Sequence, residues 1–296
     1  MTKRQNGQQV LVGVQVGRLR ITALCLDSSL RQLGKSKRST KIDRGPQGVA
    51  RRIVRTVLDA VDEADAGPEH LMSVGVALAA DFHPGETSPR RPWPAAWKRA
   101  SLFAELKKQL SVPFSLAPLG AAAVFGVQEE VSNCSRLAAV VFEEELSGGV
   151  ICDGELQPDY DEKVLGQDRW LSWGEPMHNL PGKKRYRKLA NLLAKKDRDA
   201  MELFASIVAQ LSRVLVRTID AYQPERIALV GLGAEELKGE VLEALATTRQ
   251  LSGLLKKVPL EVPASSTIAC QLGAADLALR EGRASMSKEG SVSSGQ

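Results

Sequence analysis

The order in which apolar strands and amphipathic helices follow one another constrains this chain most, because that order occurs twice. Residues 9–27 alternate between apolar and polar side chains and are rich in β-branched residues, which predicts two strands. Apolar residues at helical spacing follow in 45–64, and a buried strand is predicted over 71–79. The second half starts again with strands between residues 137 and 152 and continues into a long amphipathic helix at 199–222. Strands followed by helices in both halves predict an α/β protein with two lobes around a cleft.

Composition is that of a globular protein with a sizeable core, with 43% hydrophobic and 25% charged residues. The longest uncharged apolar stretch, residues 116–127, is too short to span a membrane, and the polar N-terminus does not resemble a signal peptide. The four cysteines lie far apart with no Cys-x-x-Cys pair, which is typical of reduced thiols and argues against a cysteine-rich zinc site. We therefore expect a cytoplasmic protein without a membrane span.

Basic residues are unevenly distributed, although the formal net charge is only +5. One early cluster consists of Lys35, Lys37, Arg38, Lys41 and Arg44. A second cluster consists of Lys183, Lys184, Arg185, Arg187 and Lys188. Such runs form either a solvated face or a binding surface for an anionic partner, and both interpretations stay open here.

Six segments resemble motifs of the ROK family (repressors, open reading frames and sugar kinases), and the resemblance extends from about residue 10 to 279. They are residues 12–20, 75–81, 92–97, 147–156, 224–233 and 271–275. The resemblance implies a two-lobed, actin-like ATPase (ribonuclease H-like) sugar kinase fold, ATP-dependent phosphorylation of a sugar, and a bacterial-type homo-oligomer.

The expected domain limits combine this resemblance with composition. Residues 1–115 form the first lobe, completed by a returning C-terminal helix at 268–282, and residues 116–267 form the second lobe. Residues 283–296 are polar and lack periodicity, which predicts a disordered tail.

The departures from the family pattern fall on its catalytic positions. Where the family has its catalytic aspartate, this chain has Leu119, which cannot accept a proton from a sugar hydroxyl. The aspartate of the first phosphate loop is replaced by Gln15, and its Gly-Thr pair, after Gly17, by Arg18 and Leu19.

The second phosphate loop departs from the family as well. The family's Gly-Thr-Gly corresponds to Glu143, Glu144 and Glu145, whose carboxylates would repel a polyphosphate. Glycines remain nearby at Gly148 and Gly149, and a further pair remains in a nucleotide-loop relic at Gly231 and Gly233.

A sugar site is implied by Glu175 and His178, which resemble the family's Glu-x-Gly-His motif. Aromatic faces for a carbohydrate would come from Trp93, Trp97 and Trp173. The alternative for His178 is an ordinary loop histidine. The family's cysteine-rich zinc module is replaced by the basic run from Lys183, so we expect no metal.

The sequence thus favours a ROK-like pseudokinase that binds a small carbohydrate or a partner without catalysis. An unorthodox glucokinase-like enzyme, which would need ATP and Mg²⁺, is the alternative. A transcriptional regulator is weaker, because the first predicted strand begins near residue 9 and leaves no room for a helix-turn-helix domain.

Overall fold

The computed structural model describes residues 8–79, 102–131, 134–158, 160–169, 171, 173, 177, 180 and 182–292, except the side chains of 161, 162, 167 and 283–292. The chain forms two compact units. The first unit is Met1–Gly126 with Cys270–Gln296, and the second unit is Val127–Ala269.

The first unit contains a five-stranded sheet of order β3-β2-β1-β4-β5. Its strands are β1 (Val10–Val16), β2 (Arg20–Leu26), β3 (Gln32–Ser39), β4 (Leu71–Leu78) and β5 (Phe114–Pro118). The first three strands pair antiparallel, whereas β4 and β5 run parallel to β1. The two strands expected in residues 9–27 are therefore β1 and β2.

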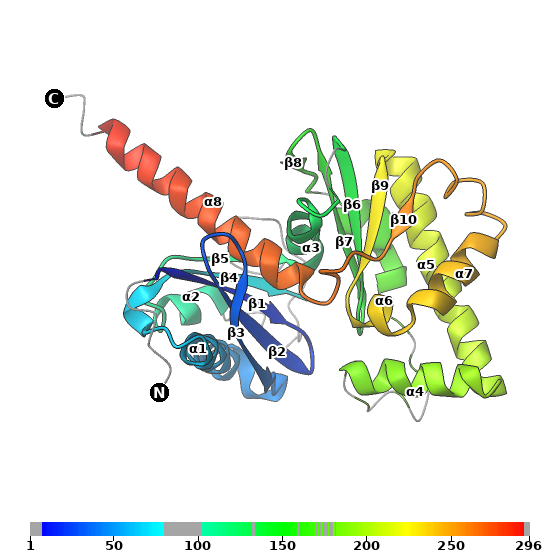
Figure 1. Ribbon diagram of the computed structural model, residues 1–296, viewed down its shortest axis with the longest axis horizontal. Coiled ribbons are helices and arrows are strands. Elements are labelled where there is room, and N and C mark those ends of the chain that lie inside the picture. The colour runs from blue at the N-terminus through cyan, green and yellow to red at the C-terminus, as the bar shows by residue number, and fades with distance from the viewer. Residues whose placement is uncertain are drawn as a thin grey trace. The chain divides into compact units, whose positions relative to one another are not determined.

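Helices cover both faces of this sheet (Figure 1). They are α1 (Gly45–Glu63), α2 (Leu102–Lys107), α3 (Leu119–Val127) and α8 (Ala269–Val292), with 3-10 turns at Ile42–Arg44 and Pro68–His70. The even-numbered valines of β1 share a core with the apolar face of α1, whereas Gly13 faces α8. Strand alternation therefore assigns α1 and α8 to opposite faces.

The second unit repeats this topology, because its sheet has the order β10-β9-β6-β7-β8. Its strands are β6 (Arg136–Phe142), β7 (Leu146–Cys152), β8 (Glu155–Leu156), β9 (Arg226–Val230) and β10 (Leu260–Glu261). Again the first three strands form antiparallel pairs and the last two run parallel to the first. Each sheet therefore has two hairpins followed by two parallel strands.

The helices of the second unit lie in sequence between β8 and β9 and between β9 and β10. They are α4 (Gly182–Ala194), α5 (Arg198–Tyr222), α6 (Leu232–Glu236) and α7 (Lys238–Thr247), after short turns at Asp161–Leu165 and Gly166–Arg169. Asp197 caps α5 by accepting a hydrogen bond from the amide of Ala200 at 3.0 Å. Buried residues along α5 join the aromatic and aliphatic side chains of the sheet in one core.

Two limits differ from those expected from the sequence. The first unit extends to Gly126 rather than to residue 115, because α3 packs on α8: the thiol of Cys270 donates to the carbonyl of Leu119 at 3.7 Å. Helix α8 continues to Val292, ten residues past the expected helix end. Residues 283–292 contain no proline, and extending an existing helix costs less than starting one.

Glycines allow α8 to approach the sheet at backbone distance. An ideal Cβ on Gly75 would lie 1.8 Å from the carbonyl oxygen of Ala274, and one on Gly13 would lie 1.8 Å from that of Gln271. A Cβ on Gly273 would lie 1.7 Å from the carbonyl oxygen of Ala122. The C-terminal helix is thus fixed to β1, β4 and α3 at positions where only glycine fits.

We expect Gly75→Ala to lower the free energy of unfolding by about 1–3 kcal/mol, because the methyl group would force α8 off the sheet. Gly239→Ala is the matched control, since a Cβ built there in α7 has no atom within 4 Å apart from its chain neighbours and the backbone of its own helix. The control should keep or raise stability by up to about 1 kcal/mol. Urea-induced unfolding measures both, and equal midpoints for the two variants would contradict the close packing of α8.

Candidate functional site

Most of the expected sugar-binding residues cannot be placed. Trp93, Trp97, Glu175 and His178 lie outside the described residues. The phosphate-loop positions, Leu119 and Trp173 are described, and they lie within one unit or the other.

The turn between β1 and β2 is closed by its own hydrogen bonds. The amide of Gly17 donates across the turn to the carbonyl of Arg20 at 2.8 Å. The carbonyl of Gly17 accepts from the hydroxyl of Thr40 at 2.7 Å. Arg18 is exposed, and Gln15, on β1, has an amide in place of a carboxylate. The Gly17 amide is therefore already bonded within the protein, and Gln15 supplies no anionic metal ligand.

The acidic turn between β6 and β7 places one carboxylate at the start of a helix. Oε1 of Glu143 accepts a hydrogen bond from the amide of Leu232 at 2.9 Å. Leu232 is the first residue of α6, where backbone amides lack partners within the helix and the helix dipole favours negative charge. Glu143 thus occupies the position next to the glycine loop in which an anion would be stabilised.

The glycine that precedes this helix adopts a conformation with φ of 101°, which favours glycine. A Cβ on Gly231 would lie 2.8 Å from the carbonyl oxygen of Phe142 and 3.0 Å from the Glu143 side chain. The acidic turn and the Gly231 loop therefore lie directly against each other.

The backbone of the acidic turn is also held by buried side chains. The carbonyl of Glu143 accepts a hydrogen bond from the hydroxyl of Tyr186, and the carbonyl of Glu144 accepts one from Nε1 of Trp173 at 3.3 Å. Glu145 is buried, and its carbonyl accepts from the amide of Glu143 at 3.3 Å. Burial, followed by the charge of Glu143, raises the pKa of Tyr186 well above its usual value, so its hydroxyl stays a donor.

Trp173 belongs to the core of the second unit. Its side chain is only 8% exposed, and its ring meets that of Tyr186 edge-on with centroids 5.3 Å apart. The guanidinium of Arg185 lies over the same ring at 4.8 Å, and its Nε donates to the carbonyl of Met177 at 3.1 Å. In this arrangement the Trp173 ring packs against protein on its face and edge rather than offering a surface to a carbohydrate.

Packing within the unit accounts for two of the remaining motif glycines. A Cβ on Gly148 would lie 2.3 Å from the ring of Tyr160, and one on Gly233 would lie 2.7 Å from the ring of Phe142. Gly149 lies on β7 opposite Ala139. Gly148 and Gly233 are therefore needed by the fold whether or not a nucleotide binds.

Leu119, which the sequence motif aligned with the family's catalytic aspartate, is the first residue of α3 and is 2% exposed. Its side chain is an alkyl group buried in the first unit, and it cannot accept a proton. No general base is available at this position.

The structure resembles solved sugar kinases over nearly its whole length. The ROK hexokinase of Thermus thermophilus superposes with a TM-score of 0.66 at 19% identity, covering 93% of this chain and 99% of that one. The ROK glucokinase of Streptomyces griseus, solved with glucose and AMPPNP, gives 0.65 at 15% identity, covering 92% and 99%. The fold is that of the ROK-family sugar kinases. It confirms the expected actin-like α/β architecture.

The same fold occurs in a ROK-family transcriptional regulator, a homologue of the E. coli MLC protein. That structure has a TM-score of 0.61 at 13% identity, and the match covers 93% of this chain and 78% of the regulator. By sequence, no model of a known protein family and no curated protein matches this chain. Likeness to the ROK proteins thus rests on structure and on the short motifs.

The second basic cluster, Lys183 to Lys188, lies in α4, and much of its charge is used within the unit. Glu236 lies 2.7 Å from Nζ of Lys183 and 3.0 Å from Nε of Arg187. Arg185 is buried against Trp173, whereas Lys184 is exposed and Lys188 is half-buried. The structure thus gives three of these five residues a role in holding α4 in place.

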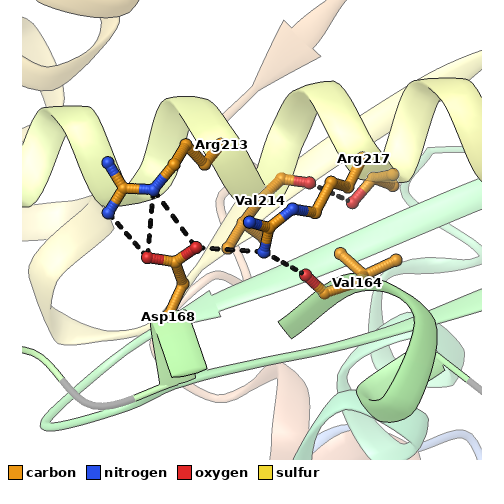
Figure 2. Close-up of polar contacts among 6 residues, drawn as sticks. Val164, Asp168, Arg213, Val214 and Arg217 are labelled. Carbon is orange, nitrogen blue, oxygen red and sulfur yellow. Dashed lines mark hydrogen bonds and ion pairs between the residues drawn. The ribbon is translucent and has the colours of Figure 1, made fainter. Parts of the chain in front are cut away.

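One strongly paired carboxylate was not foreseen from the sequence. Asp168, whose side chain is 12% exposed, lies between Arg213 and Arg217 on α5 (Figure 2). Its oxygens are 2.6 Å from Nη2 of Arg213 and 3.0 Å from Nη1 of Arg217, and Arg217 also donates to the carbonyl of Val164. The hydrogen bonds from Arg213, followed by the charges of both arginines, hold the pKa of Asp168 below its usual value. Such a carboxylate stays ionised and serves as an anchor for α5 rather than as a base.

Metal ligands and membrane segments were also sought. Within the described ranges, no three His, Cys, Asp or Glu side chains gather in a group that could hold a metal ion. In the same part of the chain, no helix combines the length and the apolar character that crossing a bilayer requires.

We expect Asp168→Asn to lower the free energy of unfolding at pH 7 by about 1.5–3 kcal/mol, because two charge-assisted contacts are lost. The folded-state pKa is lowered, so this stability is present above the unfolded pKa and is lost as the pH falls through the folded one. The difference from wild type should therefore shrink below about pH 4 in urea unfolding.

Glu202→Gln serves as the control for this prediction, since its pair with Arg198 is exposed on both sides. It should change stability by less than about 1 kcal/mol. A pH-independent loss in Asp168→Asn would show that the carboxylate charge is not what holds α5.

Proposed function

We propose that this chain is a degenerate ROK-family protein that no longer transfers phosphate from ATP to a sugar and acts instead by binding a ligand or partner. The observation that supports the proposal best is the hydrogen bond from the Leu232 amide to the Glu143 carboxylate. In the motif that resembles the family's nucleotide loop, the protein's own Glu143 carboxylate accepts a hydrogen bond from the first amide of α6.

Electrostatics explains why this contact opposes a nucleotide. Two like charges at about 4 Å repel by about 4 kcal/mol at the effective dielectric constant near a protein surface. A phosphate beside Gly231 would meet the Glu143 carboxylate and would have to compete with it for the Leu232 amide. The described residues of this loop therefore do not fit ATP with Mg²⁺.

The first unit supports the proposal independently. The Gly17 amide is bonded across the hairpin, Gln15 is not an anionic metal ligand, and Leu119 is buried and aliphatic. One such departure could reflect a shift in alignment, but these lie on two separate strand ends. Together they remove the base, the metal ligand and an open phosphate loop.

A small carbohydrate is the ligand class that the fold suggests, since the Streptomyces griseus glucokinase was solved with glucose. A carbohydrate site in this chain would use Glu175 and His178, with Trp93 or Trp97 as an aromatic face. The family resemblance also predicts a homo-oligomer, and a cytoplasmic location remains an expectation from composition.

The alternative is an unorthodox glucokinase-like enzyme. It is supported by the solved kinases of the same fold. A transcriptional regulator is a weaker alternative, supported by the ROK-family regulator of the same fold.

We expect no ADP formation from ATP with glucose or N-acetylmannosamine in a coupled assay, because the base position is Leu119. The informative variant is Glu143→Gln, whose side-chain oxygen can still accept from Leu232 while its charge is gone. This variant should bind AMPPNP at least about tenfold more tightly than wild type by calorimetry, still without turnover.

Glu202→Gln, which removes an exposed carboxylate elsewhere in the second unit, should leave AMPPNP binding unchanged. Wild-type turnover that is abolished by Glu175→Gln with His178→Gln would overturn the loss of kinase activity. Unchanged AMPPNP affinity in Glu143→Gln would instead reject only the blocking role of Glu143.

We expect the purified protein to contain no stoichiometric zinc. A structural zinc site needs about four ligands, usually cysteine-rich, and the four cysteines of this chain are free thiols far apart in sequence. Elemental analysis by mass spectrometry checks this expectation. One zinc per chain that is lost in His178→Ala would contradict it.

A further inference from the structure

A cavity of about 510 Å³ in the first unit lies beside the N-terminal half of α1 and the end of β3. Five of its seven lining residues are arginines: Arg38, Arg44, Arg51, Arg52 and Arg55, with Gln47 and Gly48 completing the wall. We call it the arginine cavity. It lies away from both phosphate loops in sequence, and the proposed function does not use it.

Helical periodicity brings most of these residues together. Gly48, Arg51, Arg52 and Arg55 follow the spacing i, i+3, i+4 and i+7, which forms one face of α1. Strand β3 contributes Arg38 from the same face as Gly34, which packs against the backbone of α1 at Ala60. The register of β3 on α1 therefore sets Arg38 opposite the arginines of the helix.

Carboxylates neutralise only part of this charge. Asp59 contacts Arg38 through a short ion pair and Arg55 at 3.7 Å. Arg52 donates to the carbonyl of Ser39 at 2.6 Å and to its hydroxyl at 2.8 Å, both uncharged acceptors.

Several arginine groups are left without an anion. Arg44 and Arg51 are exposed and form no ion pair with a carboxylate among the described residues. Nε of Arg38 is buried and has no hydrogen-bond partner within that part of the chain. Among the described residues, therefore, the hydrogen-bonding capacity of Arg38 is not fully used.

The cluster is electrostatically unfavourable when nothing is bound. Burial, followed by the charges of Arg44 and Arg38, lowers the pKa of Arg52 below its usual value. Arg44 also lies at the N-terminus of α1, where the helix dipole is already positive. An anion in the cavity would relieve this repulsion.

We propose that the arginine cavity binds a small anion that carries two or more phosphate groups. Guanidinium groups bind phosphate oxygens through paired, charge-assisted hydrogen bonds, and arginine is the residue best suited to them. The volume falls in the range of small-ligand pockets and suits a compact polyanion rather than the long, regular backbone of a duplex.

Isothermal titration calorimetry with inorganic pyrophosphate at low salt tests the proposal. The variant Arg44→Gln with Arg51→Gln removes two exposed guanidinium groups that make no ion pair in the described residues, so the fold should persist; circular dichroism checks it. Pyrophosphate affinity should fall at least about tenfold, since each charge-assisted contact contributes that much.

The matched control is Lys35→Gln with Lys37→Gln, which removes the same charge from the exposed side of β3 outside the cavity. It should change the affinity less than about twofold, because exposed charges act weakly at a distance. Equal losses in the two double variants, or no pyrophosphate binding by wild type, would overturn the proposal.

Parallel titrations distinguish the source of the phosphate groups. Equal affinities for pyrophosphate and ADP would assign recognition to the phosphates alone, and much tighter ADP binding, lost in the Arg44 and Arg51 variant, would assign a nucleotide. If the ADP affinity changes in Glu143→Gln but not in the Arg44 and Arg51 variant, ADP binds to the second unit. That result would bear on the proposed function and would reject ADP as a ligand of the arginine cavity. A 20-base-pair DNA duplex that displaces pyrophosphate at lower concentration would reject a small anion in favour of nucleic acid.

Discussion

The backbone-distance contact between α8 and the first sheet is the constraint on which the first unit depends. Residues from 270 onward return to a unit whose remaining residues end at Gly126, so the unit is completed by a segment distant in sequence. Gly13, Gly75 and Gly273 make the contact sterically allowed. Because the helix backbone lies where a methyl group would be, the contact specifies both where α8 lies and which residues β1 and β4 can carry there.

The same distinction between packing and ligand binding explains the motif glycines of the second unit. A glycine in a phosphate loop leaves room for a neighbouring side chain or for a ligand. Here Gly148 accommodates Tyr160, Gly233 accommodates Phe142, and Gly231 lies against Glu143. Glycines can thus persist for the fold alone, and a motif of glycines supports the architecture more strongly than it supports nucleotide binding. The charges of the residues beside these glycines, such as Glu143, indicate more directly whether the loop can accept a phosphate.

Sequence periodicity predicted β1, β2 and β4 of the first sheet, β6 and β7 of the second, and the helices α1 and α5, because burial on one face leaves a regular pattern. It did not predict β3, β8 or β10, which are polar at alternate positions or only two residues long. It could not predict that Trp173 is buried beside Tyr186, since aromatic residues in an irregular segment fit a core and a ligand site equally well. The bond from Leu232 to Glu143 joins residues 89 positions apart and depends on the pairing of β6 with β9. Asp168 was missed for the same reason, because its partners lie more than forty residues away on α5. Charge pattern alone therefore found the acidic turn but could not show that the Glu143 carboxylate accepts from the Leu232 amide.

The two basic segments show how structure changes the meaning of a charge run. In α4, Glu236 forms ion pairs with Lys183 and Arg187, and the guanidinium of Arg185 lies over the ring of Trp173. The charges of these three basic residues therefore have partners within the second unit. Along α1, Asp59 is the only carboxylate within ion-pair distance of the cavity arginines among the described residues, and it serves two of them. Uncompensated positive charges that lie close together repel one another and cost stability. An anion that binds only the folded state must return part of that stability through linkage. A cluster that destabilises the free protein yet lines a concave site is therefore better explained by recognition of an anion than by solubility, for which dispersed surface charge would suffice.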